Sequence, residues 1–316
     1  MRQHITRDYN SFEINKPRGI ISKLSKEDRL KDEIDYYRNI DDVNSIFFPR
    51  FFDSDDPGVL NLEYYAYNNL GDYMIYQDFD SGFWEQVVDQ IKCVLDSFGK
   101  NCKHGNFSDF ARKMYIDKTE HYYNDLIQNF DKFKSISDHK TLKFNGKSYL
   151  NFEEIWDNIK GIIEEDLLPL DTMQVIHGDF CFSNVMCGVN EKTDTCLLKC
   201  VDPRGRFGEK GIYGDVLYDI GKLRHSYEGG YEYIIYDEFH LRENGTSEFE
   251  VSFSNNNLHQ IAKVFNNHSI FNSREVKLIQ GLIYIGMCSR HYDSVDRQTV
   301  MYNQGIKFLN EVLNDE

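Results

Sequence analysis

The sequence of 316 residues has little of several features that mark particular classes of protein. It contains only five prolines and two tryptophans, and no two cysteines have the CxxC spacing. No stretch approaches the roughly 18 consecutive apolar residues of a membrane-spanning helix. The N-terminal residues MRQHITRDYN lack the apolar run of a secretory signal peptide. These absences lead us to expect a cytoplasmic protein with reduced thiols and no membrane span.

Positive charge is also scarce. The chain carries 36 lysines and arginines against 52 aspartates and glutamates, which gives a net charge of −16. A field of this sign repels phosphate backbones and anionic lipid heads. Nucleic-acid binding depends on clustered lysines and arginines that neutralise phosphates, so we expect no nucleic-acid partner. A local basic pocket inside an acidic protein stays compatible with this balance.

The cysteines do not predict a metal site. Cys181, Cys187, Cys196 and Cys200 are spaced by 6, 9 and 4 positions, which does not match structural zinc sites. A free cysteine packs like a small apolar side chain. We therefore expect these residues on core strands.

The chain divides into two parts by pattern. Residues 11–14 and 19–23 predict two strands joined by a turn, residues 27–39 predict a helix, and residues 59–67 predict a further strand. The remainder has mainly helical periodicity, with apolar faces at 83–98, 107–130, 152–168, 275–290 and 295–313. The exception is 175–201, which predicts a strand, a loop and a hairpin. A short hairpin in a helical body is where we expect the chemistry.

Three polar motifs lie in or directly after this exception. HGDFCFSN begins at His177 and contains Asp179 and Asn184, VDPRGR contains Asp202, and GDVLYDI contains Asp219. Phosphoryl transfer needs a carboxylate that orients a hydroxyl, and hard oxygen ligands that hold Mg²⁺. Pairing of the hairpin strands would bring Asp202 back beside Asn184. The spacing therefore predicts a phosphoryl-transfer centre.

HGDFCFSN resembles the HGDxxxxN loop of the aminoglycoside phosphotransferase and choline kinase family, and GDVLYDI resembles that family's GDxxYDLA segment. The resemblance implies a two-lobed α+β protein-kinase-like fold, with an N-lobe at 1–66 and a helical C-lobe at 67–316. It implies that Asp179 is the catalytic base, that Asn184 and Asp202 bind Mg²⁺, and that Asp219 supports the loop. We expect His177 to hold the same loop through hydrogen bonds. For Asp215, a role as an acid at the N-terminus of a helix is as well supported as a role in the site.

The N-terminal part resembles the nucleotide-binding part of the same family. Lys23 lies where a lysine binds the α- and β-phosphates of ATP or GTP, and Glu33 lies where its partner acid belongs. Residues 62–67, which include Glu63 and Tyr65, look like the hinge that binds the base. No GxGxxG loop precedes Lys23, so the loop over the phosphates is either short or replaced by residues 10–18. Lys16 and Lys26 are rival candidates for the phosphate-binding lysine.

The acceptor is predicted from Arg204 and Arg206, which follow the metal aspartate closely. Arginine suits bidentate binding of phosphate or carboxylate, so we expect an anionic sugar derivative as acceptor. Structural salt bridges are the alternative role of these arginines. Residues 201–226 also resemble proteins encoded with capsule and surface-polysaccharide genes, which indicates the same class of acceptor.

Several other functions stay open on the sequence. A choline or aminoglycoside kinase, a protein kinase and a nucleotidyltransferase would use the same scaffold. The missing glycine-rich loop also fits a pseudokinase that binds nucleotide without turnover. An interaction protein that binds no nucleotide is the last alternative.

Overall fold

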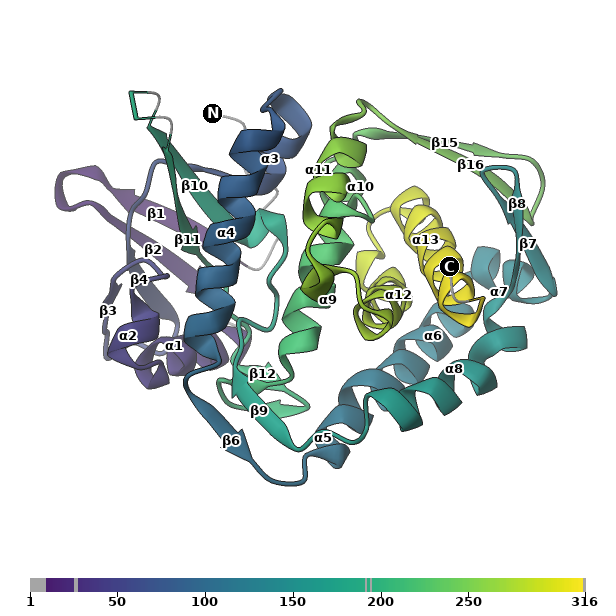
Figure 1. Ribbon diagram of the computed structural model, residues 1–316, viewed down its shortest axis with the longest axis horizontal. Coiled ribbons are helices and arrows are strands. Elements are labelled where there is room, and N and C mark those ends of the chain that lie inside the picture. Colours follow the sequence, from purple (N-terminus) through teal and green to yellow (C-terminus); the bar gives the residue numbers. More distant parts are fainter. Residues whose placement is uncertain (1–9, 26–27, 191, 194, 315–316) are drawn as a thin grey trace.

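The computed structural model describes residues 10–25, 28–190, 192–193 and 195–314 (Figure 1). Its N-terminal part is an antiparallel sheet in the order β1-β2-β4-β3. The sheet and its helices comprise β1 (Asn10–Asn15), β2 (Ile20–Ser25), α1 (Asp28–Asn39), α2 (Asp42–Ser45), β3 (Phe51–Phe52) and β4 (Val59–Glu63). The predicted hairpin and helix are confirmed. The predicted strand at 59–67 is shorter, because the chain leaves the sheet after Glu63.

The chain then enters a body made mainly of helices. Its first half contains β5 (Asn68–Asn69), α3 (Leu70–Tyr76), α4 (Ser81–Phe98), β6 (Cys102–His104), α5 (Ser108–Arg112), α6 (Lys118–Asn129), α7 (Asp131–Ser137), β7 (Thr141–Phe144), β8 (Lys147–Leu150) and α8 (Phe152–Asp166). A π-helical turn at Lys113–Asp117 joins α5 to α6. The helical stretches predicted here agree with α4, α5–α6 and α8.

The second half carries the predicted hairpin and the last helices. Its elements are β9 (Thr172–Val175), β10 (Val185–Asn190), β11 (Thr195–Cys200), β12 (Arg206–Phe207), β13 (Glu209–Lys210), β14 (Tyr213–Gly214), α9 (Val216–Tyr227), α10 (Tyr231–Ile235), β15 (Phe239–Glu243), β16 (Glu248–Phe253), α11 (Asn257–Asn266), α12 (Arg274–Cys288) and α13 (Val295–Leu313). None of the helices in the described part of the chain combines the length and the apolar character that a bilayer crossing requires.

The expectation of one hairpin in an otherwise helical body is wrong. A second four-stranded sheet, in the order β15-β16-β7-β8, lies at the end of the molecule away from the N-terminal sheet (Figure 1). Its central pair is parallel and joins Lys143 to Glu248. Local pattern cannot reveal such a pair, because the two strands are far apart in sequence.

The β10–β11 hairpin is fixed by a core that it shares with α4 and α1. One face of β10–β11 is buried together with apolar residues of α4 and α1. Cys187 and Cys200 lie on this buried face, so they pack as core residues. The backbone N–H of Cys200 also donates to the carbonyl of Phe47, 2.7 Å away, which ties β11 to the segment after α2. The site elements are therefore held against the N-terminal sheet.

Candidate active site

Strand pairing brings the two predicted metal ligands to one end of the hairpin. Val185 faces Cys200 in the antiparallel register, and the N–H of Val201 donates to the Asn184 carbonyl at 2.9 Å. Asp202 therefore follows directly beside Asn184, as the spacing predicts. The backbone of Asp202 is left-handed, with φ of 58°. This conformation costs a non-glycine residue on the order of 1–3 kcal/mol and is typical of functional positions.

The loop before Asn184 is held in place by a buried carboxylate. Asp219, on α9, accepts hydrogen bonds from the backbone N–H groups of His177 and Gly178 at 2.6 and 2.7 Å. Burial raises the pKa of Asp219 to about 7, against the effect of these two donors. Gly178 has φ of 77°, and a Cβ there would lie 2.8 Å from the Arg204 Cβ. The predicted loop-supporting position of Asp219 agrees with these contacts.

His177 is fully buried and belongs to the support of the loop. Its ring stacks on Phe48 and Phe180, and its Nε2 lies 2.9 Å from the Val201 carbonyl. Burial lowers the pKa of His177 to about 4, so the ring is neutral at pH 7. Asp215 caps α9 through the N–H of Leu217 and accepts the Tyr115 hydroxyl, which is the helix-capping alternative.

The N-terminal sheet contributes a lysine to the same place. Lys23 Nζ lies 2.7 Å from the Glu33 carboxylate on α1 and 2.5 Å from Asp202 Oδ1. Lys23 and Glu33 are 13% and 8% exposed, whereas the Asp202 side chain is 47% exposed. One ammonium thus sits between two carboxylates, and the outer carboxylate faces solvent.

The electrostatics of this group follow from burial and pairing. Burial raises the pKa of Glu33 to about 8, although Lys23 draws it down. Burial also disfavours the charged form of Lys23, but Asp202 and Glu33 outweigh it and raise the Lys23 pKa. For Asp202, burial acts upward and Lys23 acts downward, with a lowered pKa as the result. Asp202 is therefore ionised at neutral pH.

Asp179 lies between two cations. Its Oδ2 meets an Arg204 Nη at 2.5 Å, and its Oδ1 meets Lys222 Nζ at 2.8 Å. Burial opposes ionisation of Asp179, but the two cations hold its pKa well below the usual range. The backbone carbonyl of Asp179 accepts the amide Nδ2 of Asn184 at 2.9 Å, which fixes this amide.

Three other predicted site residues, Arg206, Glu63 and Tyr65, make ion pairs or hydrogen bonds outside the group around Asp179. Arg206 extends to α1 and binds Asp32 at 2.8 Å, with Lys210 on the second oxygen of the same carboxylate. This is the salt-bridge alternative, and it engages the Arg206 side chain with Asp32 of α1. At the predicted hinge, the Tyr65 hydroxyl donates to Glu63 at 2.9 Å.

The structure also bears on the predicted cover of the phosphates. The turn at Lys16–Arg18 ends at Gly19, whose carbonyl accepts the N–H of Tyr64 at 2.8 Å. This turn therefore lies near the predicted hinge, away from the Lys23 end of β2. Residues 10–15 pair with β2 and place Phe12 opposite Lys23, and the role of residues 10–18 as cover for the phosphates stays a prediction. Lys26 lies outside the described residues.

Two functional candidates escape the sequence motifs. Lys222 follows Asp219 on α9, and only its 5% exposed side chain and its ion pair reveal it. Glu232 is fully buried and accepts the backbone N–H of Ser183 and the hydroxyl of Ser226 at 3.0 and 2.9 Å. Burial raises the pKa of Glu232 to about 7. The available signal for Lys222 was its place one turn after Asp219 on the same helix.

The donor set suits Mg²⁺ bound together with phosphates. Asn184 Nδ2 is used by Asp179, which leaves Oδ1 pointing away from that bond and without a hydrogen-bond donor among the described residues. Asp202 supplies a half-exposed carboxylate. No three His, Cys, Asp or Glu side chains cluster as a metal site in the described ranges. Mg²⁺ is usually bound through one or two protein oxygens plus phosphate oxygens, so this pair fits it.

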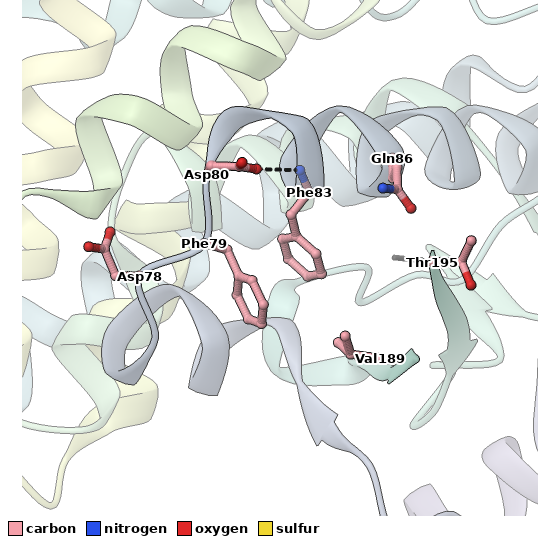
Figure 2. Close-up of a pocket in the computed structure, with 7 residues that line it drawn as sticks. All are labelled: Asp78, Phe79, Asp80, Phe83, Gln86, Val189 and Thr195. Atoms are coloured by element: carbon pink, nitrogen blue, oxygen red, sulfur yellow. Dashed lines mark hydrogen bonds between the residues drawn. The ribbon is translucent and has the colours of Figure 1, made fainter. Parts of the chain in front are cut away.

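A hollow on another side of the hairpin has a different character. Figure 2 shows it between α3, the start of α4 and the tip of β10–β11, lined by Asp78, Phe79, Asp80, Phe83, Gln86, Val189 and Thr195. The rings of Phe79 and Phe83 stack 4.0 Å apart, and Asp80 caps α4 through the Phe83 N–H at 3.0 Å. These contacts serve the fold.

Comparison with known proteins gives matches of fold and no match of sequence. No protein-family model matches the chain, and no curated protein matches its sequence. A thermostable mutant of aminoglycoside phosphotransferase APH(4)-Ia, in its apo form, matches with a TM-score of 0.57 and 12% identity, over 98% of this chain and 93% of that chain. The chain has a protein-kinase-like fold.

Two further structures agree with this assignment. Choline kinase from Cryptosporidium parvum Iowa II matches with a TM-score of 0.50 and 10% identity, over 99% of this chain and 89% of that chain. A mutant aminoglycoside 2′-phosphotransferase in complex with GDP matches with a TM-score of 0.51 and 11% identity, over 98% and 90%. The protein-kinase-like fold, of mixed α+β class, confirms the expected fold. At such identities the likeness is one of fold.

Proposed function

We propose that the protein is a small-molecule kinase that transfers the γ-phosphoryl group of ATP or GTP to a hydroxyl of a small acceptor. The observation that carries the proposal is the meeting of Lys23 with Asp202, 2.5 Å apart, beside Asn184 and the loop of Asp179. A phosphate-binding lysine, two oxygen ligands and a carboxylate are the parts that phosphoryl transfer needs. The protein-kinase-like fold supports the same reading.

The proposed roles follow from these positions. The acceptor oxygen attacks the γ-phosphorus, the bond between that phosphorus and the β–γ bridging oxygen breaks, and the nucleoside diphosphate leaves. The hydroxyl proton passes to the Asp179 carboxylate. Lys23, held by Glu33, would bind the phosphates, and Asn184 and Asp202 would hold Mg²⁺, which would neutralise phosphate charge. His177 and Asp219 position the loop, as the hydrogen bonds to its backbone support.

The division into lobes is part of the proposal. We take residues 1–66 as the lobe that binds the nucleotide phosphates and 67–316 as the lobe that carries the hairpin and the acceptor site. In support, the chain leaves the first sheet at Glu63 and pairs with β10 from Asn68 onward. Glu63 and Tyr65 lie at this crossing, where the backbone would meet the base. The GDP complex of the similar phosphotransferase makes GTP as well as ATP worth testing.

For the acceptor we propose an anionic sugar derivative. Arg204 supports this class because it lies beside Asp179, whereas Arg206 is engaged by Asp32. Synthesis of surface polysaccharides, as the setting for such an acceptor, rests on the sequence of residues 201–226 alone.

A nucleotide-binding pseudokinase is the second candidate. The observation that favours it is the Arg204–Asp179 ion pair, which covers one oxygen of the proposed base. Turnover of any acceptor would decide against it.

The test is a two-stage assay. A thermal-shift measurement with ATP or GTP, with and without Mg²⁺, first establishes nucleotide binding. Diphosphate release is then measured with a panel of sugars, sugar phosphates, uronic acids, choline and aminoglycosides, using Asp179→Asn as the inactive control. Kinase activity predicts Mg²⁺-dependent binding and release that the control lacks. Binding without release for the whole panel favours the pseudokinase, and no binding refutes both.

A further inference from the structure

The two cations on Asp179 differ in their freedom to move. Lys222 is 5% exposed, and its ammonium lies 3.8 Å from the Met287 sulfur and 5.5 Å from the centre of the Tyr231 ring. Arg204 is 39% exposed and lies in the connection between β11 and β12. Breaking a buried ion pair leaves an uncompensated charge, whereas a partly exposed pair is weak. Arg204 is therefore the partner that can leave.

Arg204 covers the oxygen that an acceptor needs. Asp179 Oδ1 is engaged by buried Lys222, so Oδ2, engaged by Arg204, is the oxygen on the exposed side. A general base must come within about 2.6–3.2 Å of the hydroxyl oxygen. With the guanidinium in place at 2.5 Å, Arg204 occupies one of the acceptor positions of Oδ2 and crowds this approach.

An anionic group is the partner that could replace Asp179 on the Arg204 guanidinium. Guanidinium binds phosphate and carboxylate through paired hydrogen bonds, and a neutral hydroxyl offers no comparable attraction. A third cation lies nearby, because Lys118 Nζ is 3.0 Å from the hydroxyl of Tyr218, one turn before Lys222 on α9. Two cations thus pair with Asp179, and a third, Lys118, lies on a neighbouring tyrosine, in a chain of net charge −16.

We propose that Arg204 is a latch on the catalytic carboxylate that the acceptor opens, when a phosphate or carboxylate group of the acceptor takes the guanidinium from Asp179. Lys222 keeps the carboxylate in position while Arg204 moves. The inference rests on the proposed kinase function and adds that turnover requires an acceptor with its own anionic group. Water and neutral alcohols leave the latch closed, which limits wasteful hydrolysis of the nucleotide.

The first test is a binding measurement that needs no turnover. Aldohexoses, their phosphates and their uronic acids are titrated calorimetrically into protein saturated with ADP and Mg²⁺. Asp179→Asn removes the charge that holds Arg204, so the latch predicts about fivefold tighter binding of the anionic sugars. Arg204→Ala should weaken them about tenfold, and the neutral sugars should change less than about twofold. Arg112→Ala, which removes a surface pair with Glu164, is the matched control.

A second variant guards against misfolding, because Asp179→Asn leaves the buried ammonium of Lys222 unpaired. Asp179→Asn combined with Lys222→Met removes both charges and should also tighten the anionic sugars. Unchanged or weaker anion binding in a folded variant overturns the latch, as does a panel in which no anionic sugar binds better than its neutral parent. Failure of ADP and Mg²⁺ to bind would instead refute the proposed function.

The hydrolysis rate is an independent readout. Arg204→Ala exposes Asp179 to water, so nucleotide hydrolysis without acceptor should rise several-fold, while Arg112→Ala leaves it unchanged. An equal fall in hydrolysis and in turnover of every acceptor would mean that Arg204 assists the reaction directly, and this would overturn the latch.

Discussion

The site contains two groups of three ionisable side chains with opposite composition. At the nucleotide end, one cation, Lys23, lies between the carboxylates of Glu33 and Asp202. At the acceptor end, one carboxylate, Asp179, lies between the cations Arg204 and Lys222. In each group one outer member is buried and the other is partly exposed. The partly exposed members are Asp202 and Arg204, with 47% and 39% of their side chains exposed.

This difference assigns a ligand to each end. The exposed carboxylate, Asp202, is ionised at neutral pH and attracts a cation, and the neighbouring Asn184 offers an oxygen of the kind that Mg²⁺ prefers. The exposed cation, Arg204, attracts an anion. Mg²⁺ with nucleotide at one end and an anionic acceptor at the other would thus each meet an exposed group of opposite charge beside the transferred phosphoryl.

The largest effect is expected at the acceptor end. Asp179→Asn should lower kcat about 10²–10⁴-fold, because the hydroxyl loses its proton acceptor. Nucleotide binding should stay within about twofold, because the nucleotide-end group is untouched. Steady-state kinetics together with calorimetry separates the two effects. A variant that keeps a tenth of the activity would remove Asp179 from the role of base.

A substitution at the nucleotide end should affect nucleotide binding. Asp202→Asn should weaken Mg²⁺-dependent nucleotide binding about 10–100-fold, since a charge-assisted interaction is lost. Its carboxylate is half-exposed, so the fold should tolerate the change. Asp53→Asn, which loses a surface pair with Arg38, serves as control. Equal affinity in the presence of Mg²⁺ would break the comparison between the two ends.

Glu232 accepts the backbone N–H of Ser183, in the loop between Asp179 and Asn184, and it predicts a pH effect on stability. Burial raises the pKa of Glu232 to about 7, above its unfolded value. The folded state therefore binds more protons between about pH 4.5 and 7, and stability is lost as pH rises through this window. Glu232→Gln, which has no proton to lose, should gain on the order of 3 kcal/mol relative to the native chain between pH 4.5 and 8. Urea unfolding of both proteins at pH 4.5 and pH 8 measures this difference. An equal change in the free energy of unfolding of the two proteins would contradict it.

The smallest effect is expected at Arg206. Arg206→Ala should change the acceptor KM by less than about twofold and the free energy of unfolding by about 0.5 kcal/mol, because its pair with Asp32 is partly exposed and Lys210 remains. Arg204→Ala, two residues away, provides the contrast. A large rise in KM for the Arg206 variant would return Arg206 to the acceptor site.

Much of the site could be predicted because its parts are local in sequence. Asp179 and Asn184 lie on one loop, and the two-residue period of the hairpin sets Asp202 beside Asn184. Lys23 and Glu33 lie on consecutive elements. The pairing of Lys222 with Asp179 could not be read, because it depends on how α9 packs beneath the loop. The direction of Arg204 and Arg206 depends on Gly205, whose φ is 58° and whose Cβ would lie 2.3 Å from the Asp32 carbonyl.

The fold shows the same division between local and distant information. The long amphipathic helices α4, α8 and α13 follow from apolar periodicity. The sheet β15-β16-β7-β8 does not, because its parallel pair joins strands separated by about a hundred residues with several helices between them. Short strands of mixed polarity carry little signal until their partners are known.

The most direct test of the two-ended site is a crystal structure with Mg²⁺ and a non-hydrolysable ATP analogue. We predict the metal at about 2.0–2.1 Å from an Asp202 oxygen and from Asn184 Oδ1, with Lys23 on the phosphates and the γ-phosphate facing Asp179. A nucleotide bound elsewhere, or a metal that contacts neither residue, would contradict the account.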